Sequence, residues 1–248
     1  MLEIKNLMVF FENALAVNDL SMEVKKGEIV GVLGSNSAGK STLMNTISGL
    51  IIDMKIKEQR RGGERITILG KITFEGEDIL YAKPSYRVKK GIVLARERHP
   101  VFGESSVMEN LRIAGYLRKY AEVREAIDFV FETFPRLKEI KDRRGGLLSG
   151  GEQQMLIIGM TLVARPRLLL LDEPLLGLAP ALQADLMKAV KQIRDSMGVT
   201  ILVTEQFARP LLPIIDRGYV VENGMLCLAG SRDELMNNPE VISAYFGV

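Results

Sequence analysis

Short runs of apolar residues recur along the chain, and each is followed by a turn or by a helical pattern. Continuous runs of this kind are typical of parallel strands that are buried on both faces. The opening residues Met1–Lys5 instead alternate between apolar and polar, which predicts a first strand. The pattern therefore indicates an α/β fold, with buried strands at residues 29–33, 91–95, 168–171 and 200–204.

Helical spacing occupies the interval between the second and third of these strands. Ser106 and Glu109 form a capping-box pattern that opens one helix. A further helix is expected up to Pro135, because the apolar residues at 123, 127, 130, 131 and 134 follow helical spacing. We expect one domain over residues 1–248, with a core at 1–95 and 161–230, a helical lobe inserted at about 96–160, and a C-terminal helix at 231–248.

Two later segments also carry helical patterns. Residues 181–197 place five apolar side chains on one face, which we interpret as core packing. These residues are Leu182, Leu186, Ala189, Ile193 and Met197. Ser231 and Glu234 form a second capping box, which predicts a short helix that ends near residues 237–239.

A complete phosphate-loop motif, G-x-x-x-x-G-K-[ST], lies after the first buried strand and before a helical segment. In that setting backbone N–H groups surround the β- and γ-phosphates at the positive end of the helix, Lys40 adds a charge, and the Ser41 hydroxyl can bind Mg²⁺. The alternative is an ordinary glycine turn followed by a surface lysine, but such a turn does not require the complete motif spacing between a strand and a helix. We therefore predict a nucleoside triphosphate site formed by Gly34, Ser35, Asn36, Ser37, Ala38, Gly39, Lys40, Ser41 and Thr42.

Two adjacent carboxylates, Asp172 and Glu173, follow four consecutive leucines at the end of the third buried strand. Open parallel sheets bind ligands at this edge. An isolated Asp-Glu pair usually marks a turn or a helix start. Beside a phosphate loop, the two carboxylates can instead bind a metal ion and orient water. We expect Asp172 to hold Mg²⁺ and Glu173 to polarise the attacking water, because phosphoryl transfer needs a positioned nucleophile and neutralised charge.

A third motif occupies Leu148–Gln154 and opens the helix that runs to Ala164. Ser149 alone would be an ordinary N-cap, and the glycines alone an ordinary turn. The whole string closely resembles the signature L-S-G-G-[EQ]-Q-[QR] of ABC-type ATPases, and the three motifs follow the order and spacing of that family. The resemblance covers nearly all of the chain and implies a P-loop NTPase core with a small antiparallel β lobe.

The resemblance further implies a dimer, either a homodimer or a heterodimer with a related ATPase subunit, with two ATP molecules in its interface. Each ATP would be held by one subunit's phosphate loop and, in trans, by the other subunit's Ser149, Gly150, Gly151 and Glu152. A helix N-terminus with bare glycine backbones is a suitable clamp for a γ-phosphate. Neither subunit alone would then be a competent ATPase.

Three single positions can be carried over from the family. Phe11 matches the aromatic residue that stacks on adenine, although a core phenylalanine is the alternative and Phe10 is its neighbour. Glu97 stands where most members have a glutamine that contacts Mg²⁺ and the attacking water. Gln206 stands at the switch position that histidine usually holds. Since His99 is the only histidine of the chain, the resemblance implies that no histidine switch exists here.

The chain resembles the ATP-binding subunits of branched-chain amino acid importers, the LivF type. The resemblance rests on Glu97, Gln206, the Gly177–Pro180 segment and the C-terminal sequence. Ser37, the stretch Arg96–His99 and Leu175 do not match that group. A basic stretch, residues 55–65, is longer than in typical relatives. We interpret its first part, up to residue 61, as a solvated loop, with an interaction site as the alternative.

The composition limits where in the cell the protein is expected to act. The longest nearly apolar stretch, Met155–Ala164, is about half as long as a membrane span. No export signal precedes the first strand, and the lone Cys227 is expected to be a buried core residue in a reducing cytosol. The net charge of +2 argues neither for nor against nucleic acid, and we expect no nucleic-acid partner. We expect a cytoplasmic protein, peripheral on the inner face of the cell membrane.

The function implied by the resemblance is ATP hydrolysis that powers uptake of branched-chain amino acids through separate transmembrane permease subunits. The lobe near residues 97–117 would push on those subunits, and an extracytoplasmic solute-binding protein would take part indirectly. A urea or amide importer is one alternative, and a soluble ATPase of iron–sulfur assembly is another. A small-molecule kinase is disfavoured because a kinase has no use for the Leu148–Gln154 string.

Overall fold

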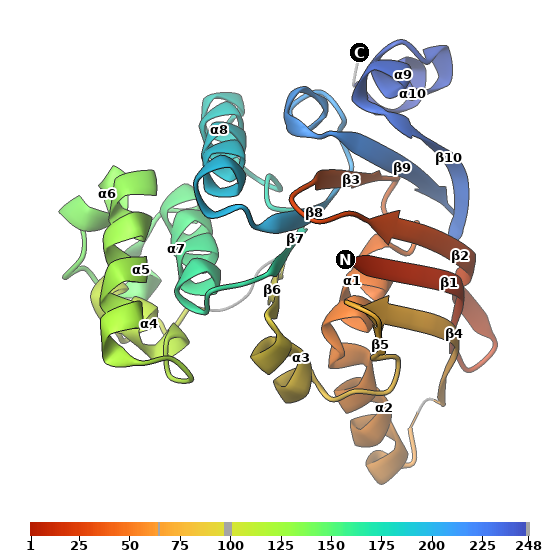
Figure 1. The fold of residues 1–248 in the computed structure, drawn as a ribbon, viewed down its shortest axis with the longest axis horizontal. Helices are drawn as coiled ribbons and strands as arrows, with labels where there is room; N and C mark the ends of the chain where they lie inside the picture. The colour runs from red at the N-terminus through yellow and green to blue at the C-terminus, as the bar shows by residue number, and fades with distance from the viewer. Residues whose placement is uncertain (64, 97–100, 247–248) are drawn as a thin grey trace.

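The strands form two sheets in the computed structural model, which describes residues 1–63, 65–96 and 101–246 (Figure 1). A sheet ordered β10-β9-β3-β8-β7-β6 lies at the centre, and a smaller sheet ordered β2-β1-β4-β5 lies beside it. The strands are β1 Leu2–Phe11, β2 Ala14–Val24, β3 Ile29–Leu33, β4 Ile66–Phe74, β5 Glu77–Asp78, β6 Ile92–Ala95, β7 Leu168–Asp172, β8 Thr200–Glu205, β9 Arg217–Glu222 and β10 Met225–Ser231.

Helices pack around the larger sheet and form a separate group to one side of it (Figure 1). Those near the sheets are α1 Lys40–Ser48, α2 Leu50–Arg61, α3 Pro84–Lys90, α8 Pro180–Met197, α9 Arg232–Met236 and α10 Pro239–Tyr245. The group to one side contains α4 Val107–Ala114, α5 Tyr120–Thr133, α6 Pro135–Glu139 and α7 Gly150–Val163. Short 3₁₀ turns occupy Gly145–Leu147 and Leu212–Ile214.

The four apolar runs form the parallel strands β3, β6, β7 and β8, which confirms the predicted α/β core. Alternate residues of each strand face opposite sides of the sheet. In β7, Leu169 and Leu171 join the apolar cluster under the helical group, whereas Leu168 and Leu170 join the cluster shared with the smaller sheet. Both faces are therefore covered, which is why these strands are mainly apolar and show no polar alternation. Their buried polar residues lie at strand ends, at Asp172 in β7 and at Thr200, Thr204 and Glu205 in β8.

The smaller sheet is antiparallel, and its strand β1 pairs with β2 and β4. The predicted first strand is thus confirmed. Leu2 and Ile4 are buried while Glu3 and Lys5 are exposed, so the alternation at the start of the chain reports a strand with one covered face.

Arg87 of α3 connects the helices that follow the phosphate loop to the smaller sheet. Its side chain is fully buried and donates hydrogen bonds to the carbonyl oxygens of Thr46, Ile47, Leu80 and Ala82 at 2.6–3.0 Å. Burial lowers the pKa of Arg87 to about 10. The four hydrogen bonds that Arg87 donates satisfy this buried cation.

The helical group is fixed at both ends of α4. The Ser106 capping box is formed as predicted. Asn110 is buried and bonds the backbone of Phe102 through both its oxygen and its amide nitrogen, at 2.8 and 3.0 Å. Arg118 donates two bonds to the carbonyl oxygen of Ala164, at 2.7 and 2.9 Å, which ties the α4–α5 connection to the end of α7.

The proposed division of the chain stays a prediction, and two elements bear on it. Helix α7 continues to Val163, so the expected boundary at about residue 160 falls inside a helix. The C-terminal segment contains two helices, α9 and α10, and the second begins at Pro239, because proline suits the first turn of a new helix better than the interior of an old one.

Three expectations were wrong in whole or in part. On α8, Leu186, Ala189 and Ile193 are buried as predicted, but Leu182 and Met197 near the helix ends are 37% and 38% exposed, because the core contacts only the middle turns. Cys227 is exposed, since β10 is the edge strand of its sheet and its odd-numbered positions face outward. The basic residues 55–61 form the second half of α2 and not a loop, because that helix continues past the apolar contacts of its first turn.

Candidate functional site

The phosphate loop connects β3 to α1 in a conformation that requires glycine at two positions. Gly39 has φ +99°, and a Cβ atom there would lie 2.4 Å from the carbonyl oxygen of Ala16. A Cβ atom on Gly34 would lie 2.5 Å from the carbonyl oxygen of Val221. The loop backbone is thus held tightly by neighbouring strands at both ends. Among the described residues no side chain caps α1, so its first N–H groups remain available to an anion.

Ser37 is strained, and this position is one of the departures from the family pattern. Its φ of +66° lies in the left-handed region that glycine adopts without steric cost. The usual glycine at this position therefore has a conformational reason that the sequence alone did not give.

Lys40 lies across the loop. Its Nζ atom donates to the carbonyl oxygens of Gly34 and Ser35, both at 2.8 Å, and forms an ion pair with Glu173 Oε1 at 2.9 Å. The two charged side chains are only 3% and 10% exposed. The predicted lysine and the predicted carboxylate therefore meet in one buried place.

Asp172 lies at the end of β7, where the predicted edge of the sheet is. Its Oδ1 atom accepts hydrogen bonds from Thr204 Oγ1 at 2.8 Å and from Ser41 Oγ at 3.3 Å. Glu173 follows with a left-handed φ of +47°, and its N–H donates to Thr204 Oγ1 at 3.1 Å. Thr204 thus orients both carboxylate residues, and the sequence analysis did not identify it.

Glu205 is a second residue that sequence reasoning missed. Its side chain accepts a hydrogen bond from the N–H of Leu175 at 2.9 Å, and its backbone carbonyl accepts one from Gly34 at 3.3 Å. Burial, with a smaller contribution from the nearby Glu173, raises the pKa of Glu205 to about 8. Its position at the end of a buried strand, directly before Gln206, was the signal that could have revealed it.

A cavity of about 330 Å³ opens beside the loop and has the size of a small-ligand site. It brings together the predicted Phe11, the carboxylate of Glu173 and the start of α1. The lining residues are Phe11, Ala16, Ser37, Gly39, Lys40, Ser41, Thr42 and Glu173. Phe11 is partly buried against the apolar cluster of the smaller sheet, so its ring is fixed at the cavity wall.

Other predicted residues lie near this cavity without lining it. Ser35 and Asn36 are exposed on the loop, and Ala38 is buried beneath it. Gln206 is half-buried at the end of β8, one residue beyond Glu205. Glu97 lies outside the described residues.

The signature residues cap a different helix. Ser149 Oγ accepts a hydrogen bond from the N–H of Glu152 at 3.3 Å, and the Glu152 carboxylate accepts one from the N–H of Ser149 at 2.9 Å. The hydrogen bond from the Ser149 N–H lowers the pKa of Glu152, and so does the ion pair with Arg136 at 2.9 Å. A Cβ atom on Gly150 would meet nothing within 4 Å, so this backbone is open to approach. Within the described chain, none of these residues lines the phosphate-loop cavity.

The site can hold a cation only with help from a ligand. The residues that the structure describes contain no cluster of three or more His, Cys, Asp or Glu side chains that could bind a metal by themselves. Ser41 on the cavity wall and Asp172 behind it, in contact at 3.3 Å, offer two side-chain oxygens to a cation. This donor set fits Mg²⁺, which prefers oxygen ligands and usually completes its shell with phosphate and water.

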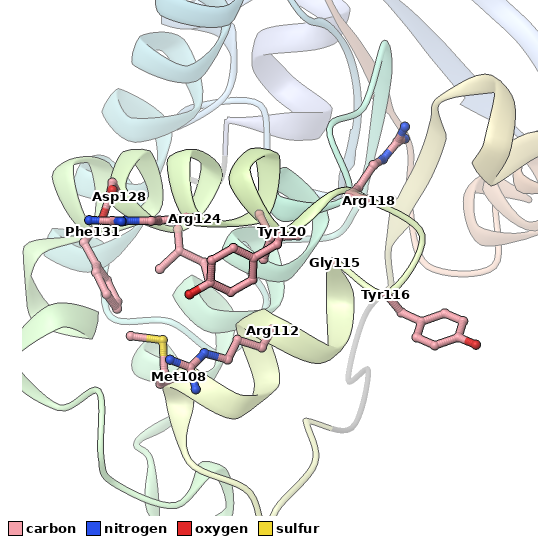
Figure 2. A pocket seen from close by; sticks show the side chains of 11 residues that line it. Met108, Arg112, Gly115, Tyr116, Arg118, Tyr120, Arg124, Asp128 and Phe131 are labelled. Carbon is pink, nitrogen blue, oxygen red and sulfur yellow. The ribbon is translucent and has the colours of Figure 1, made fainter.

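A second cavity of about 470 Å³ lies between α4 and α5 (Figure 2). Met108 and Arg112 line it from α4, and Tyr120 and Phe131 line it from α5. Tyr116 also lines the cavity and is 88% exposed. An uncovered aromatic and apolar surface of this kind is typical of a site that contacts another protein.

Within the described part of the chain, none of the helices has the length and apolar character needed to cross a bilayer.

Comparison with known proteins finds relatives that align with the full length of this chain. The ABC transporter family model matches residues 17–176. The High-affinity branched-chain amino acid transport ATP-binding protein BraG of Pseudomonas aeruginosa is 39% identical over 247 residues, covering 100% of both chains. The Probable branched-chain amino acid transport ATP-binding protein LivF of Archaeoglobus fulgidus is 32% identical, covering 93% of this chain and 92% of its own.

A solved structure gives the same picture of the fold. The crystal structure of the ADP conformation of an ATP-binding cassette of an ABC transporter superposes with a TM-score of 0.82 at 27% identity. It covers 100% of this chain and 99% of its own. The similarity therefore includes both sheets and the helical group.

Proposed function

Because the chain belongs to the ABC transporter family, we propose that it is the ATP-hydrolysing subunit of an importer for branched-chain amino acids. The family and the P-loop fold that the motifs predicted are confirmed, and so is the ATPase activity, since ATP-binding proteins of this family hydrolyse ATP. The names of the two relatives favour branched-chain amino acids over urea or amides. The iron–sulfur assembly alternative is likewise not favoured.

One observation carries the catalytic part of the proposal: Lys40 and Glu173 meet at 2.9 Å on the wall of the cavity that the phosphate loop borders. Lys40 would leave this ion pair to contact the phosphates of ATP. The freed Glu173 carboxylate would then orient and polarise the attacking water. Phe11 would stack on the adenine ring, and Gln206 would donate a hydrogen bond to the γ-phosphate.

We infer that Ser41 and Asp172 hold Mg²⁺ with the phosphates, and Glu97 is proposed as a further contact. The ion would neutralise charge on the phosphate oxygens. Thr204 keeps the Asp172 carboxylate turned toward Ser41, because it donates to the same oxygen at 2.8 Å. Loss of Thr204 would therefore weaken the metal site without removing a ligand.

We infer that the cavity is completed by the signature helix of a second subunit, in a homodimer or a heterodimer. Ser149, Gly150, Gly151 and Glu152 supply a capped helix N-terminus with an open glycine backbone. Such a helix end favours an anion, and a two-fold interface would form both sites from the same surface.

We infer that the transmembrane permease subunits contact the helical group near the α4–α5 cavity. The exposed Tyr116 and Tyr120 offer aromatic contact area there. Arg118 joins this surface to Ala164 at the end of α7, and α7 begins at the signature. A push on the α4–α5 connection would thus move the signature helix as a rigid element. The solute itself would contact only the permease and an extracytoplasmic binding protein.

The composite site is tested by light scattering on a Glu173→Gln protein with and without ATP. We expect an ATP-dependent shift from monomer to dimer. Adding Ser149→Arg should abolish the shift, whereas adding Ser231→Arg should not. Ser231 is a matched control, because it also caps a helix through a capping box but lies on α9. A dimer that forms equally with all three proteins would contradict the role of the signature.

The transport role is tested by reconstituting the chain with its permease subunits in vesicles. ATP-driven uptake of leucine, isoleucine and valine is expected, and it should be absent with Glu173→Gln. Equal ATP-driven uptake of urea without uptake of leucine would assign the solute to the alternative importer class.

A further inference from the structure

The second half of α2 extends beyond the packed core of the protein. Ile51 and Ile52 in its first turn are 1% and 8% exposed. Gln59 lies two turns beyond Ile52 on the same side of the helix, yet it is exposed. In Figure 1 this half of α2 projects beyond the sheets and neighbouring helices. Nothing in the described core therefore covers the end of the helix.

The projecting half is strongly basic. Residues 55–61 carry four basic side chains and one acidic side chain, whereas the whole chain has a net charge of only +2. Lys57, Arg60 and Arg61 follow i, i+3 and i+4 spacing, so they lie on one face. None of the three forms an ion pair or a side-chain hydrogen bond within the residues that the structure describes. We call Lys55, Lys57, Arg60 and Arg61 the basic end of α2.

Further apolar and basic side chains are exposed on α2 and on the segment that packs against it. Met54, one turn before Lys57, is 38% exposed. Helix α3 packs against α2 and adds the exposed Lys83 and Lys89. Tyr81, on the connection leading into α3, is 62% exposed. Basic side chains beside methionine and tyrosine suit the boundary between water and lipid, where headgroups are charged and the region beneath them is apolar.

We propose that the basic end of α2 binds anionic lipid headgroups at the membrane surface and so helps to hold the subunit against the bilayer. The proposal rests on the proposed function, which places the protein beside membrane subunits. Within the described residues these four cations have no ion-pair partner, and each Lys or Arg close to an anionic membrane strengthens binding about fivefold. A nucleic-acid partner is less well supported, because the exposed methionine and tyrosine have no use against a phosphate backbone.

The test is co-sedimentation of the full-length protein with two kinds of vesicle. One is zwitterionic phosphatidylcholine alone, and in the other about a third of the lipid is anionic phosphatidylglycerol. Binding is expected only to the anionic vesicles, and it should fall steeply when salt is added because exposed charges are screened. Equal binding to both vesicles, or binding that salt does not weaken, would overturn the proposal.

A variant with Lys57→Gln, Arg60→Gln and Arg61→Gln should lose roughly 100-fold in vesicle binding, since three cations are removed. The matched control carries Lys138→Gln, Lys188→Gln and Lys191→Gln, which are exposed on α6 and α8 and change the net charge equally. It should bind like the unmodified protein. Equal losses in both variants would show a general charge effect and overturn the proposal.

Two further readouts separate this inference from the ATPase function. ATP hydrolysis in solution should be unchanged in the basic-end variant, because α2 contributes no residue to the phosphate-loop cavity. Absence of hydrolysis in the unmodified protein would count against the proposed function and not against lipid binding. Duplex DNA serves as a competitor. If it binds the basic end more tightly than the anionic vesicles do, the surface is a nucleic-acid site and the lipid proposal is wrong.

Discussion

Glu205 makes the stability of this protein depend on pH in a direction opposite to that of most carboxylates. Burial raises the pKa of its side chain from the usual 4.5 to about 8, and the side chain is 4% exposed. Between these two values the folded protein keeps the proton that the unfolded chain has lost. The stabilising effect is fully present below about pH 4.5 and is lost as the pH rises through about 8.

The size of the effect follows from the two pKa values. Each pKa unit corresponds to about 1.36 kcal/mol, so the difference between 4.5 and about 8 amounts to roughly 4–5 kcal/mol. Glu205→Gln keeps an oxygen that can accept the Leu175 N–H and has no ionisable proton. We expect the free energy of unfolding of this variant to fall less than that of the unmodified protein between about pH 5 and 9, by a few kcal/mol.

The assay is urea unfolding at several pH values, followed by far-ultraviolet circular dichroism, because the chain contains no tryptophan. The informative quantity is the difference between the two proteins at each pH, which cancels the titration of groups common to both. Glu240→Gln is a matched control, because Glu240 is exposed at the start of α10.

Parallel curves for the unmodified protein and Glu205→Gln would refute the reasoning, since they would mean that the carboxyl ionises alike in the folded and unfolded states. A larger pH dependence in the variant would refute its sign.

Three further changes are predicted from the backbone and from buried charge, and urea unfolding measures each. Ser37→Gly should raise the free energy of unfolding by about 1 kcal/mol, because φ of +66° strains a side-chain-bearing residue; an unchanged value would contradict that strain. Gly39→Ala should lower it by more than about 2 kcal/mol and abolish ATP binding in equilibrium dialysis, since the new Cβ would lie 2.4 Å from the Ala16 carbonyl oxygen. Arg87→Lys should cost roughly 3 kcal/mol because buried carbonyls lose their donors, whereas the exposed Arg112→Lys should cost less than about 0.5 kcal/mol; equal costs would refute the argument.

Local patterns in the sequence were sufficient for the elements and for the chemistry of the main motifs. The four apolar runs became β3, β6, β7 and β8, because strands that are buried on both faces are mainly apolar and do not alternate. The predicted capping boxes at Ser106 and Ser231 formed, and Ser149 caps its helix, because each cap needs only residues within one helical turn. The phosphate loop was recognisable for the same reason, since its function depends on backbone N–H groups of consecutive residues.

The solvent exposure of a side chain and the extent of a helix depended on segments that are distant in the sequence. Cys227 resembled a core residue because its neighbours are apolar, and only the place of β10 at the sheet edge exposes it. The basic residues 55–61 resembled a loop because they are charged, yet the helix begun by Ile51 and Ile52 extends through them. Local hydropathy cannot report such facts, since they depend on which elements pack beside a residue.

The sequence by itself thus determined the phosphate-loop motif and the neighbouring carboxylates, and predicted a triphosphate site at Lys40, Ser41, Asp172 and Glu173. Only the tertiary structure decided that Lys40 and Glu173 form a buried ion pair, and that Thr204 on a neighbouring strand holds Asp172 in place. The physical reason is that parallel strands bring their carboxyl ends to one edge of the sheet, and the order β3-β8-β7 that joins these residues is set by packing and not by position along the chain.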